Sequence, residues 1–386
     1  MIARFTQQIP TKLIFGCGTI NSLETENLPG NKALIVISAG VSMRKYGYLC
    51  RVTKALKTQG VEYVVYDKIE ANPVKEHVME GAGIARSENC DFVIGLGGGS
   101  SIDSAKSIAL MSVNDGDYWD YIVGGSGKGV TPKGALPIVA IPTTAGTGTE
   151  NDPWTVITDN NEKIGYGIPA LFPVIAIVDP ELMVSVPSKF TAYQGFDAFF
   201  HAAEGYIASI ATPISDIYAL KSIELIAKSL PKAVSNGMDI EARTDVALAS
   251  TLSGMVESTS CCTSEHSMEH AMSAYFGNLP HGAGLIAISL AYFAAFVADY
   301  PAKYKKMAEA MTGKKATSPK EFLTALAELQ KQCGVEDIKL SDYGIKESDI
   351  PRFLENARRT VGNLFALDPH LLTDEEVTAI YTASYK

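Results

Sequence analysis

The residues best suited to chemistry in this chain are four histidines that follow one aspartate in its second half. Asp197 precedes His201 by four residues in a run with helical spacing, so the two side chains share one helix face. His266 and His270 have the same spacing in a second helical run over 261–276, and His281 follows in the turn LPHGAG. One carboxylate oxygen with imidazole nitrogens suits a borderline divalent cation, Fe²⁺ or Zn²⁺. The spacing therefore predicts a metal site, and it leaves open whether His266 or His270 is a ligand.

Composition argues against several function classes. Lys and Arg number 33 against 43 Asp and Glu, and the net charge of −10 argues against nucleic acid or an anionic membrane as the main partner. The start of the chain has no secretory signal pattern, and the most apolar helical stretch, 284–298, is shorter than the roughly 20 residues that span a bilayer. The six cysteines lack C-x-x-C spacing, which favours reduced thiols in a cytoplasmic protein. We expect the adjacent Cys261 and Cys262 to be buried small residues beside the metal site rather than ligands.

The first half of the chain alternates short apolar runs with helical patterns. These runs are continuous and rich in β-forming residues, which is typical of strands that are covered on both faces. Strands that alternate with helices predict a parallel sheet of βαβ units, and hence an α/β domain of the nucleotide-binding type. The apolar runs cover 33–40, 62–69, 91–99, 136–144 and 172–180, and helical patterns between them cover 44–60 and 75–90.

The strand pattern stops after about residue 188, and helical spacing follows in the segments 193–209, 215–230, 241–258, 285–300 and 320–334. Pro187 and Ser188, within the segment 183–191, can end one element and begin the next. At 386 residues the chain also exceeds one ordinary hydrophobic core. We therefore predict an α/β domain over 1–187 and an all-helical domain over 188–386 that carries the metal ligands.

A glycine run lies between a buried strand and an amphipathic helix that starts near Ser100. Gly97, Gly98 and Gly99 let backbone N–H groups approach an anion, and the helix N-terminus adds positive partial charge. The run fits neither G-x-G-x-x-G nor G-x-x-x-x-G-K-[ST], so a tight turn without a ligand is the alternative. The strand–glycine–helix context favours a pyrophosphate site at the carboxyl end of a parallel strand.

A threonine-rich loop follows the fourth apolar run. Thr143, Thr144 and Thr147 supply hydroxyl groups, and Gly146 and Gly148 keep the backbone open. A polar loop that only closes the strand is the alternative. Because the carboxyl ends of parallel strands meet at one edge of a sheet, the two loops together favour one shared ligand.

Together these motifs resemble the iron-containing, group III alcohol dehydrogenases, whose relatives include butanol dehydrogenases, lactaldehyde reductases and NADPH-dependent aldehyde reductases. The resemblance runs nearly end to end, and its most specific pieces are GFDAFFHAAE and the H-x-x-x-H … LPHG pair. It implies a Rossmann-like dinucleotide-binding domain, an all-helical metal-binding domain and a deep cleft between them, an architecture shared with dehydroquinate synthase. Further matching pieces are GLGGGSSIDSAK, PTTAGTGTE, FPVIAIVDPELM and VGNLFALDPHLLTDEEVTAIY.

The resemblance also implies roles for particular residues. It makes Asp197, His201, His266 and His281 the ligands of one divalent metal, usually iron and sometimes zinc, with His270 beside the substrate and the nicotinamide. The implied reaction moves a hydride between NAD(P)(H) and a short-chain primary alcohol or aldehyde, whose oxygen the metal polarises. A homodimer is the expected assembly. Cofactor contacts carried over on the same basis are Asn72, Gly98, Gly99, Ser100, Asp103, Thr143, Thr144, Thr147 and Lys163.

Two departures from the family bear on specificity. NAD-preferring relatives often carry an aspartate at the end of the first strand, where this chain has Ser38 followed by the cations Arg44 and Lys45. A small neutral residue with cations nearby favours NADP(H) over NAD(H). Trp154 stands where relatives often have a smaller or polar residue that faces the substrate, which favours short linear aldehydes; a core aromatic is the alternative.

The motifs also leave alternative functions open. His270 is expected to relay a proton because imidazole titrates near neutrality, and a structural histidine is the alternative. A glycerol-dehydrogenase-like polyol dehydrogenase or a dehydroquinate-synthase-like lyase would share the two-domain plan. The lyase needs a cluster of basic residues for a phosphate-bearing substrate, and the polyol enzymes usually have fewer metal histidines. A metal- or nucleotide-sensing protein is the non-enzymatic alternative.

Overall fold

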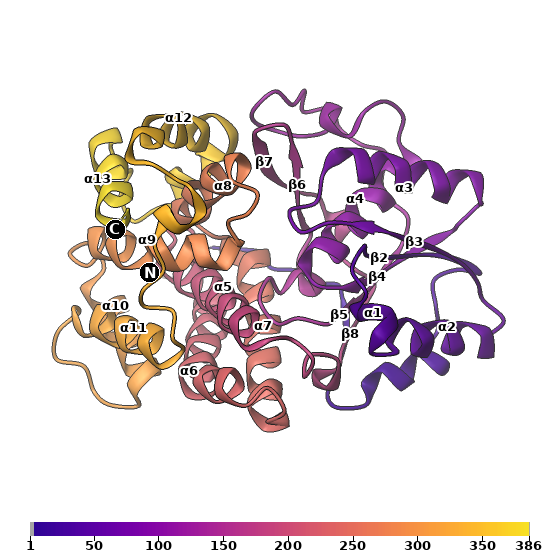
Figure 1. Ribbon diagram of the computed structural model, residues 1–386, viewed down its shortest axis with the longest axis horizontal. Coiled ribbons are helices and arrows are strands. Elements are labelled where there is room, and N and C mark those ends of the chain that lie inside the picture. The colour runs from indigo at the N-terminus through magenta and orange to yellow at the C-terminus, as the bar shows by residue number, and fades with distance from the viewer. Residues whose placement is uncertain (1–3, 386) are drawn as a thin grey trace.

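The computed structural model describes residues 4–385 and contains two halves that lie side by side (Figure 1). One half is a six-stranded parallel sheet with helices packed against it, and the other half is built from helices. This is the fold class that the sequence predicted. The chain enters the helical half at α5 (Ser188–Ile207). The division of the chain into domains at residue 187 remains a prediction.

The sheet has the strand order β1-β8-β5-β4-β2-β3, and all neighbouring strands run parallel. Pairing of Gly97 with Pro142 aligns the carboxyl ends of two central strands, so the glycine run and the threonine loop leave the sheet next to each other. Five of the six strands fall on the predicted apolar runs, and the short KLIF strand does not. The strands are β1 (Lys12–Phe15), β2 (Lys32–Ser38), β3 (Glu62–Ile69), β4 (Phe92–Gly97), β5 (Ile138–Pro142) and β8 (Ile175–Val178).

Helices cover both faces of the sheet, because strand residues alternate in direction. In β2, Leu34 and Val36 belong to the core on the side of α3 and α4, whereas Ala33 and Ile35 belong to the core on the side of α2. The predicted helix over 44–60 is divided in two at Gly47, whose φ of 75° breaks helical geometry. The helices are α1 (Ser42–Lys45), α2 (Tyr48–Thr58), α3 (Lys75–Ser87) and α4 (Gly99–Val113).

An antiparallel hairpin that was not predicted extends the α/β half toward the helices (Figure 1). It consists of β6 (Trp154–Asp159) and β7 (Glu162–Gly167), with Asn160 in the turn at a φ of 54°. The second strand, EKIGYG, carries few apolar residues, which explains why the search for apolar runs missed it. The hairpin matters to function because it brings Trp154 and Lys163 to the same region as the helical half.

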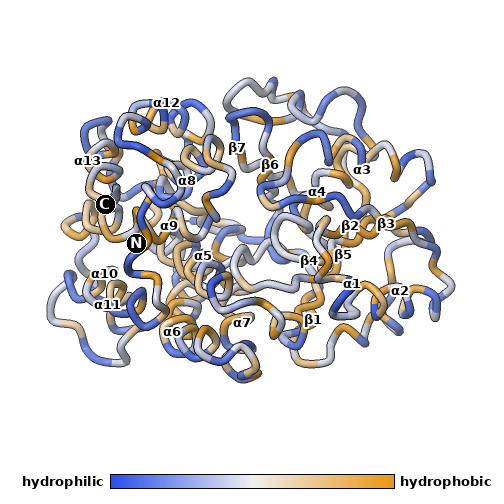
Figure 2. Tube along the Cα trace, viewed as in Figure 1, coloured by the Kyte–Doolittle hydropathy of each residue, from blue (hydrophilic) through white to orange (hydrophobic). Residues whose placement is uncertain are grey.

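The helical half is organised around α5, which packs against α6, α7 and α9. Figure 2 shows apolar segments in these helices as well as in the sheet, and the buried residues of the helical half form one large core. The helices α10, α12 and α13 were not among the predicted ones. Besides α5 the helices are α6 (Pro213–Ser235), α7 (Ile240–Ser260), α8 (Ser264–Tyr275), α9 (His281–Ala295), α10 (Pro301–Thr312), α11 (Glu321–Gln332), α12 (Ile350–Val361) and α13 (Asp374–Ser384).

Two local expectations are corrected by the structure. His281 was placed in a turn, but it is the first residue of α9, after Pro280 at the N-cap. Cys261 and Cys262 were included in the helical run of His266, but they lie between two helices, and Cys261 has a φ of 61° and a ψ of 172°. Within residues 4–385, no helix has both the length and the hydrophobicity needed to cross a bilayer.

Candidate functional site

A cavity of about 510 Å³ lies between the two halves and receives residues from both. From the α/β half come the glycine run, the threonine loop and the hairpin, and from the helical half come α5, α7, α8 and the start of α9. Parallel sheets commonly bind their ligands beyond the carboxyl ends of the strands, and this cavity lies there. The predicted residues that line it are Asn72, Gly98, Gly99, Ser100, Asp103, Thr144, Thr147, Trp154, Lys163, Asp197, His201, His266, His270 and His281.

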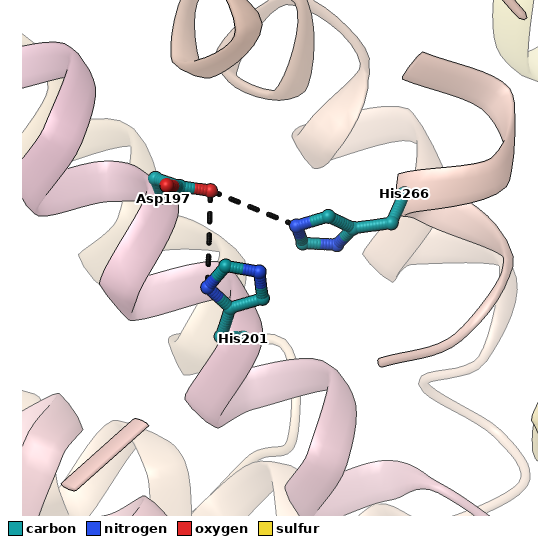
Figure 3. A group of neighbouring side chains, drawn as sticks. All are labelled: Asp197, His201 and His266. Atoms are coloured by element: carbon teal, nitrogen blue, oxygen red, sulfur yellow. Dashed lines mark ion pairs between the residues drawn. The ribbon is translucent and has the colours of Figure 1, made fainter. Parts of the chain in front are cut away.

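Asp197 lies at the centre of a cluster of imidazoles (Figure 3). Its Oδ1 atom is 3.8 Å from Nδ1 of His201 on the same helix and 3.6 Å from Nε2 of His266 on α8. The same oxygen is 3.3 Å from Nε2 of His281 at the start of α9. Three helices therefore bring four potential ligand atoms together, as the spacing of Asp197 and His201 led us to expect.

The chemistry of these atoms fits a divalent cation. Oδ1 of Asp197, Nδ1 of His201 and Nε2 of His266 are buried and have no hydrogen-bond partner within residues 4–385. Leaving such groups unpaired costs about 1–3 kcal/mol each, so a site of this kind is expected to have a ligand. Ligand atoms about 2.1 Å from one tetrahedral ion lie about 3.4 Å from one another, which is close to the observed separations of 3.3–3.8 Å.

Two buried glutamates orient the imidazoles from behind. Glu204 on α5 accepts a hydrogen bond from Nδ1 of His266, and Glu269 on α8 accepts one from Nδ1 of His281. Each contact uses one ring nitrogen and leaves Nε2 directed at Asp197. Such carboxylate–histidine pairs fix the ring and its tautomer, and they are typical partners of metal-bound histidines. The sequence analysis did not identify either glutamate.

The electrostatics of the cluster follow from this arrangement. Burial raises the pKa of Asp197, but His201 and His281 outweigh this effect and hold the pKa well below its usual range. Burial lowers the pKa of His266, but Glu204 and Asp197 raise it well above its ordinary value. Among the described residues, Asp197 is the one carboxylate that pairs with His201, and burial lowers the pKa of this histidine to about 3. The pocket thus holds a carboxylate rather than a carboxylic acid at neutral pH.

His270 lies one turn beyond His266 and belongs to a different subcluster. Its ring centroid is 6.3 Å from that of His266 and 5.5 Å from that of His281. Two groups that contain histidines each offer potential ligand atoms within 4.8 Å of one another. One consists of Asp197, His201 and His266, and the other of Glu269, His270 and His281. Burial, followed by the charge of Lys163, holds the pKa of His270 well below its ordinary value. The imidazole is therefore neutral near pH 7, and its pKa lies below the near-neutral range that the sequence analysis expected of it.

Lys163 connects the hairpin to the helical half. Its Nζ atom donates to the hydroxyl of Ser273 at 2.9 Å and to Oδ1 of Asn72 at 3.4 Å, and it lies 3.4 Å from Oε2 of Glu269. Asn72 occupies the left-handed region with a φ of 55°. The lysine therefore connects cavity-lining elements of the α/β half with those of the helical half. The sequence analysis predicted only a contact with the cofactor for this residue.

The glycine run is shaped by close contact with the threonine loop. A Cβ atom on Gly99 would lie 2.6 Å from Cγ2 of Thr147, and one on Gly98 would lie 3.2 Å from Oγ1 of Thr144. Only glycine lets these two loops pack side by side while both line the cavity. Helix α4 begins at Gly99, so its N-terminus faces the same space and favours an anion there.

Three predicted cofactor residues do not line the cavity: Ser38, Gly97 and Thr143. Gly97 ends β4 and Thr143 directly follows β5, and the Thr143 amide donates to the Gly97 carbonyl at 2.8 Å. They shape the loops rather than face the cavity. Ser38 ends β2, and the nearby Arg44 forms an ion pair with Asp67 that the sequence analysis did not foresee.

A buried polar network behind the cofactor loops also escaped prediction. Asp103, on α4, accepts hydrogen bonds from the Thr149 hydroxyl at 2.8 Å and from the Val156 amide at 3.0 Å. Burial raises the pKa of Asp103 to about 6. The fully buried Lys106 forms a 3.0 Å ion pair with Asp152 and ties α4 to the loop before the hairpin. The pairing depends on tertiary contacts, so no local sequence signal could reveal it.

The end of the cavity near Trp154 is mainly apolar. Its other lining residues there are Glu257 and Cys261 at the end of α7, Cys262, and Val361, Asn363 and Leu364 from the C-terminal region. Cys262 packs with Val361 and Leu364 in a small buried cluster. The Trp154 indole donates to the backbone carbonyl of Glu257 at 3.3 Å.

Comparison with known proteins places this geometry in a family. The sequence matches the family model "Iron-containing alcohol dehydrogenase" over residues 10–180 and "Fe-containing alcohol dehydrogenase family, C-terminal" over residues 191–385. It is 32% identical over 386 residues to the NAD-dependent methanol dehydrogenase of Bacillus methanolicus, covering 96% of this chain and 97% of that protein. It is also 32% identical over 392 residues to the NADPH-dependent butanol dehydrogenase of Clostridium saccharobutylicum, covering 99% and 98%.

The fold agrees with the sequence comparison. The crystal structure of an archaeal halo-thermophilic Red Sea brine pool alcohol dehydrogenase superposes with a TM-score of 0.95 and 32% identity, covering 100% of both chains. The chain therefore belongs to the iron-containing alcohol dehydrogenase family, as its motifs indicated. Members of this family are oxidoreductases that act on alcohols and aldehydes with a nicotinamide cofactor and a divalent metal, and this chain is an enzyme of that class.

Proposed function

We propose that this enzyme interconverts short-chain primary alcohols and aldehydes with NADP(H), using a divalent metal, most readily Fe²⁺, held by Asp197, His201, His266 and His281. The observation that carries the proposal is the convergence of His201, His266 and His281 nitrogens within 3.3–3.8 Å of one Asp197 oxygen. This cluster lies in the same cavity as the glycine run and the threonine loop, so a metal and a dinucleotide could meet there.

Different residues of the chain have different roles in the proposed reaction. When bound, the metal supplies a Lewis acid for the alcohol or carbonyl oxygen, and the nicotinamide supplies the hydride acceptor or donor. Glu204 and Glu269 orient the imidazoles, and the apolar walls near Trp154 and Leu364 exclude water. We assign to an imidazole nitrogen of His270 the transfer of the proton between the substrate oxygen and solvent.

Preference for NADP(H) rests on the end of strand β2. Ser38 carries no charge that would repel a 2′-phosphate, and Arg44 and Lys45 follow within seven residues. Arg44 is already paired with Asp67, but both side chains are about half exposed, so solvent weakens the pair and a phosphate can compete for the guanidinium. One relative is NAD-dependent and another is NADPH-dependent, so comparison alone does not decide the cofactor.

The proposal for substrate size rests on Trp154. Its indole is held by a hydrogen bond to α7 and occupies the apolar end of the cavity. A large, fixed ring leaves room for a short, linear carbon chain. The cavity of about 510 Å³ must also hold part of the dinucleotide, which limits the substrate further.

The test is a direct assay of the purified full-length enzyme. Oxidation of NADPH and of NADH is followed with butanal, lactaldehyde and glyoxal, before and after chelation and after readdition of Fe²⁺ or Zn²⁺, alongside elemental analysis. We expect turnover that is lost on chelation, returns with metal and is faster with NADPH. Turnover that persists without metal would remove the metal from the mechanism, and inactivity with every aldehyde would favour a polyol dehydrogenase, a lyase or a sensing protein.

Two further expectations accompany this proposal. We propose a homodimer, which light scattering of the purified protein tests directly. We also retain the division into an α/β domain over 1–187 and a helical domain over 188–386, which limited proteolysis would test by cleavage near residue 187.

A further inference from the structure

Glu257 lines the cavity, and its buried carboxyl group is not used by the contacts described so far. The residue is 8% exposed, and its Oε1 atom has no hydrogen-bond partner within residues 4–385. Glu257 lines the cavity at the end where Trp154, Val361 and Leu364 lie, and its carboxyl group is within 4.8 Å of the thiols of Cys261 and Cys262, which line the same end. Buried polar groups are normally paired, and those that are not require an explanation.

Three other buried carboxyl groups near the site have structural partners. Glu204 and Glu269 each hold an imidazole, and Asp152 is paired with Lys106. Glu265 is also buried without a partner, but it does not line the cavity. Glu257 thus differs from all of these because it is both unpartnered and open to a bound molecule.

Two hydrogen bonds fix the backbone at Glu257, near the end of α7. The Trp154 indole donates to the Glu257 carbonyl at 3.3 Å, and the Ser258 hydroxyl donates to the Asn151 carbonyl at 2.8 Å. These two contacts anchor the end of α7 to the loops of the α/β half. Because the backbone at Glu257 is held in this way, its side chain starts from a fixed point, and less conformational freedom is lost when it binds a ligand.

We propose that Glu257 is a specificity-determining residue that hydrogen-bonds a second hydroxyl group of the substrate, so that the preferred substrates are short hydroxyaldehydes and the corresponding diols. This inference rests on the proposed alcohol–aldehyde function and deepens it. A buried carboxyl group beside apolar walls selects for a polar substituent on a short carbon chain. A substrate that lacks the hydroxyl leaves the buried carboxyl unpaired and is therefore disfavoured.

The character of the carboxyl group favours a hydroxyl over an ammonium group. Burial raises the pKa of Glu257 well above its usual range, and a neutral carboxyl both donates and accepts a hydrogen bond, as a hydroxyl does. An ammonium substituent would require the ionised carboxylate. It would also share the cavity with Lys163 and with the cation that Asp197 and its histidines would hold.

The test compares substrates that differ only by a hydroxyl in place of a methyl group. Values of kcat/KM are measured for glycolaldehyde against propanal and for 3-hydroxypropanal against butanal, with the metal-loaded wild-type enzyme and its preferred cofactor. We expect the wild type to favour at least one hydroxylated partner by roughly tenfold to a hundredfold. Glu257→Leu should bring that ratio to about one or below, and Glu257→Gln should retain part of it because the amide still forms hydrogen bonds.

Val361→Ala is the matched control, because it changes the same wall of the cavity without removing a polar group. It should change both members of a substrate pair in parallel. Thermal unfolding of each variant, followed by circular dichroism, identifies any loss of fold. If Glu257→Leu is unstable, the ratio in the conservative Glu257→Gln variant carries the test, and an unchanged wild-type ratio in a folded Glu257→Leu enzyme overturns the inference.

The outcomes separate this inference from the proposed function. Inactivity of the wild type with all four aldehydes would contradict the proposed function itself. Equal turnover of hydroxylated and methyl-terminated partners would leave that function intact and overturn the role of Glu257. A preference for 3-aminopropanal over both 3-hydroxypropanal and butanal would also overturn it, in favour of recognition of a cation.

Discussion

Glu204 and His266 are joined across helices α5 and α8, and this contact determines which nitrogen of His266 faces the metal cluster. Oε1 of Glu204 accepts from Nδ1 of His266, and Nε2 on the other side of the ring lies 3.6 Å from Oδ1 of Asp197. Glu204 also accepts from the amide and hydroxyl of Thr263, at 2.8 and 2.9 Å, so it is itself held in place. The orientation of a predicted ligand thus depends on a residue that binds no metal.

Replacing Glu204 should weaken metal binding without removing a ligand. In Glu204→Gln, the amide is a poorer acceptor for His266, and we expect metal affinity to fall about 10–100-fold. Competition titration with a chelator measures the change. The control is Glu150→Gln, another buried glutamate, which accepts from Thr251 and forms no hydrogen bond or ion pair with an imidazole of residues 4–385. Equal affinities for wild type and Glu204→Gln would show that the contact does not support the site.

Alanine substitutions of His270 and His281 should have different effects on bound metal. His281 lies 3.3 Å from Asp197, and we expect His281→Ala to lose bound metal in elemental analysis. His270 is buried beside the cluster with Nδ1 unpartnered, and we expect His270→Ala to keep its metal while kcat falls and its dependence on pH changes. Loss of metal from both variants would make His270 a ligand, and full turnover of His270→Ala across pH would remove its role as a proton relay.

Local spacing predicted part of this site, and tertiary contacts supplied the rest. Asp197 and His201 share a helix face, so their proximity follows from helix geometry alone. Glu204 lies three residues beyond His201 on the same face, a signal that was present in the sequence but not used. His266 and His270 have equivalent spacing, and only the packing of α8 against α5 and α9 distinguishes them.

Other features had no local signal. Lys106 and Asp152 are 46 residues apart, and the unpaired state of Glu257 becomes visible only when the halves meet. The same holds for the fold. Long apolar runs predicted five strands of the main sheet, but β1 was missed because it has only four residues, and β7 was missed because few of its residues are apolar. Periodicity identifies an element only when its burial pattern is long enough to recur.

Cofactor preference should respond to charge at the end of β2. We expect Ser38→Asp to lower kcat/KM for NADPH relative to NADH, because a carboxylate there repels the 2′-phosphate. We expect Arg44→Ala to raise KM for NADPH by about tenfold and to leave KM for NADH nearly unchanged. Lys54→Ala on α2 is the control for a general loss of positive charge. If Arg44→Ala alters both cofactors equally, the preference for NADP(H) does not depend on this residue.

The stability of the protein should depend on pH through Asp368. Burial raises the pKa of this carboxyl from 3.8 to about 7, although it accepts from the Ser264 amide and the Tyr292 hydroxyl. Between these values the folded state keeps a proton that the unfolded chain has released, so the free energy of unfolding falls as pH rises from about 4 to about 7. Asp368→Asn has no proton to lose, so its stability should not decline in this window.

The measurement is chemical denaturation of wild type and Asp368→Asn at several pH values. The stability of the variant relative to wild type should increase by on the order of 2–4 kcal/mol between pH 4 and pH 8 and stay constant above that. A difference that does not change with pH would mean that Asp368 titrates near its ordinary pKa in the folded protein.

Two glycines control how closely the helical half approaches the cofactor loops. A Cβ atom on Gly254 of α7 would lie 2.0 Å from the carbonyl oxygen of Gly148, which itself has a φ of 63°. In an exposed helix interior, alanine is about 1 kcal/mol more favourable than glycine, but here the clash is with backbone that cannot move aside cheaply. We therefore expect Gly254→Ala to lower the free energy of unfolding by roughly 1–3 kcal/mol and to weaken dinucleotide binding, because Thr147 precedes Gly148 in the displaced loop.

Gly83→Ala on α3 is the matched control for this substitution. A Cβ atom at Gly83 would meet nothing within 4 Å, so alanine should stabilise the helix by about 0.5–1 kcal/mol. Opposite signs for the same chemical change, measured by denaturant unfolding, would show that contact between backbones and not helix propensity decides the outcome at Gly254. Stabilisation by both substitutions would mean that α7 can move away from the threonine loop at little cost, and titration of each variant with NADPH would then show whether the cofactor site tolerates that movement.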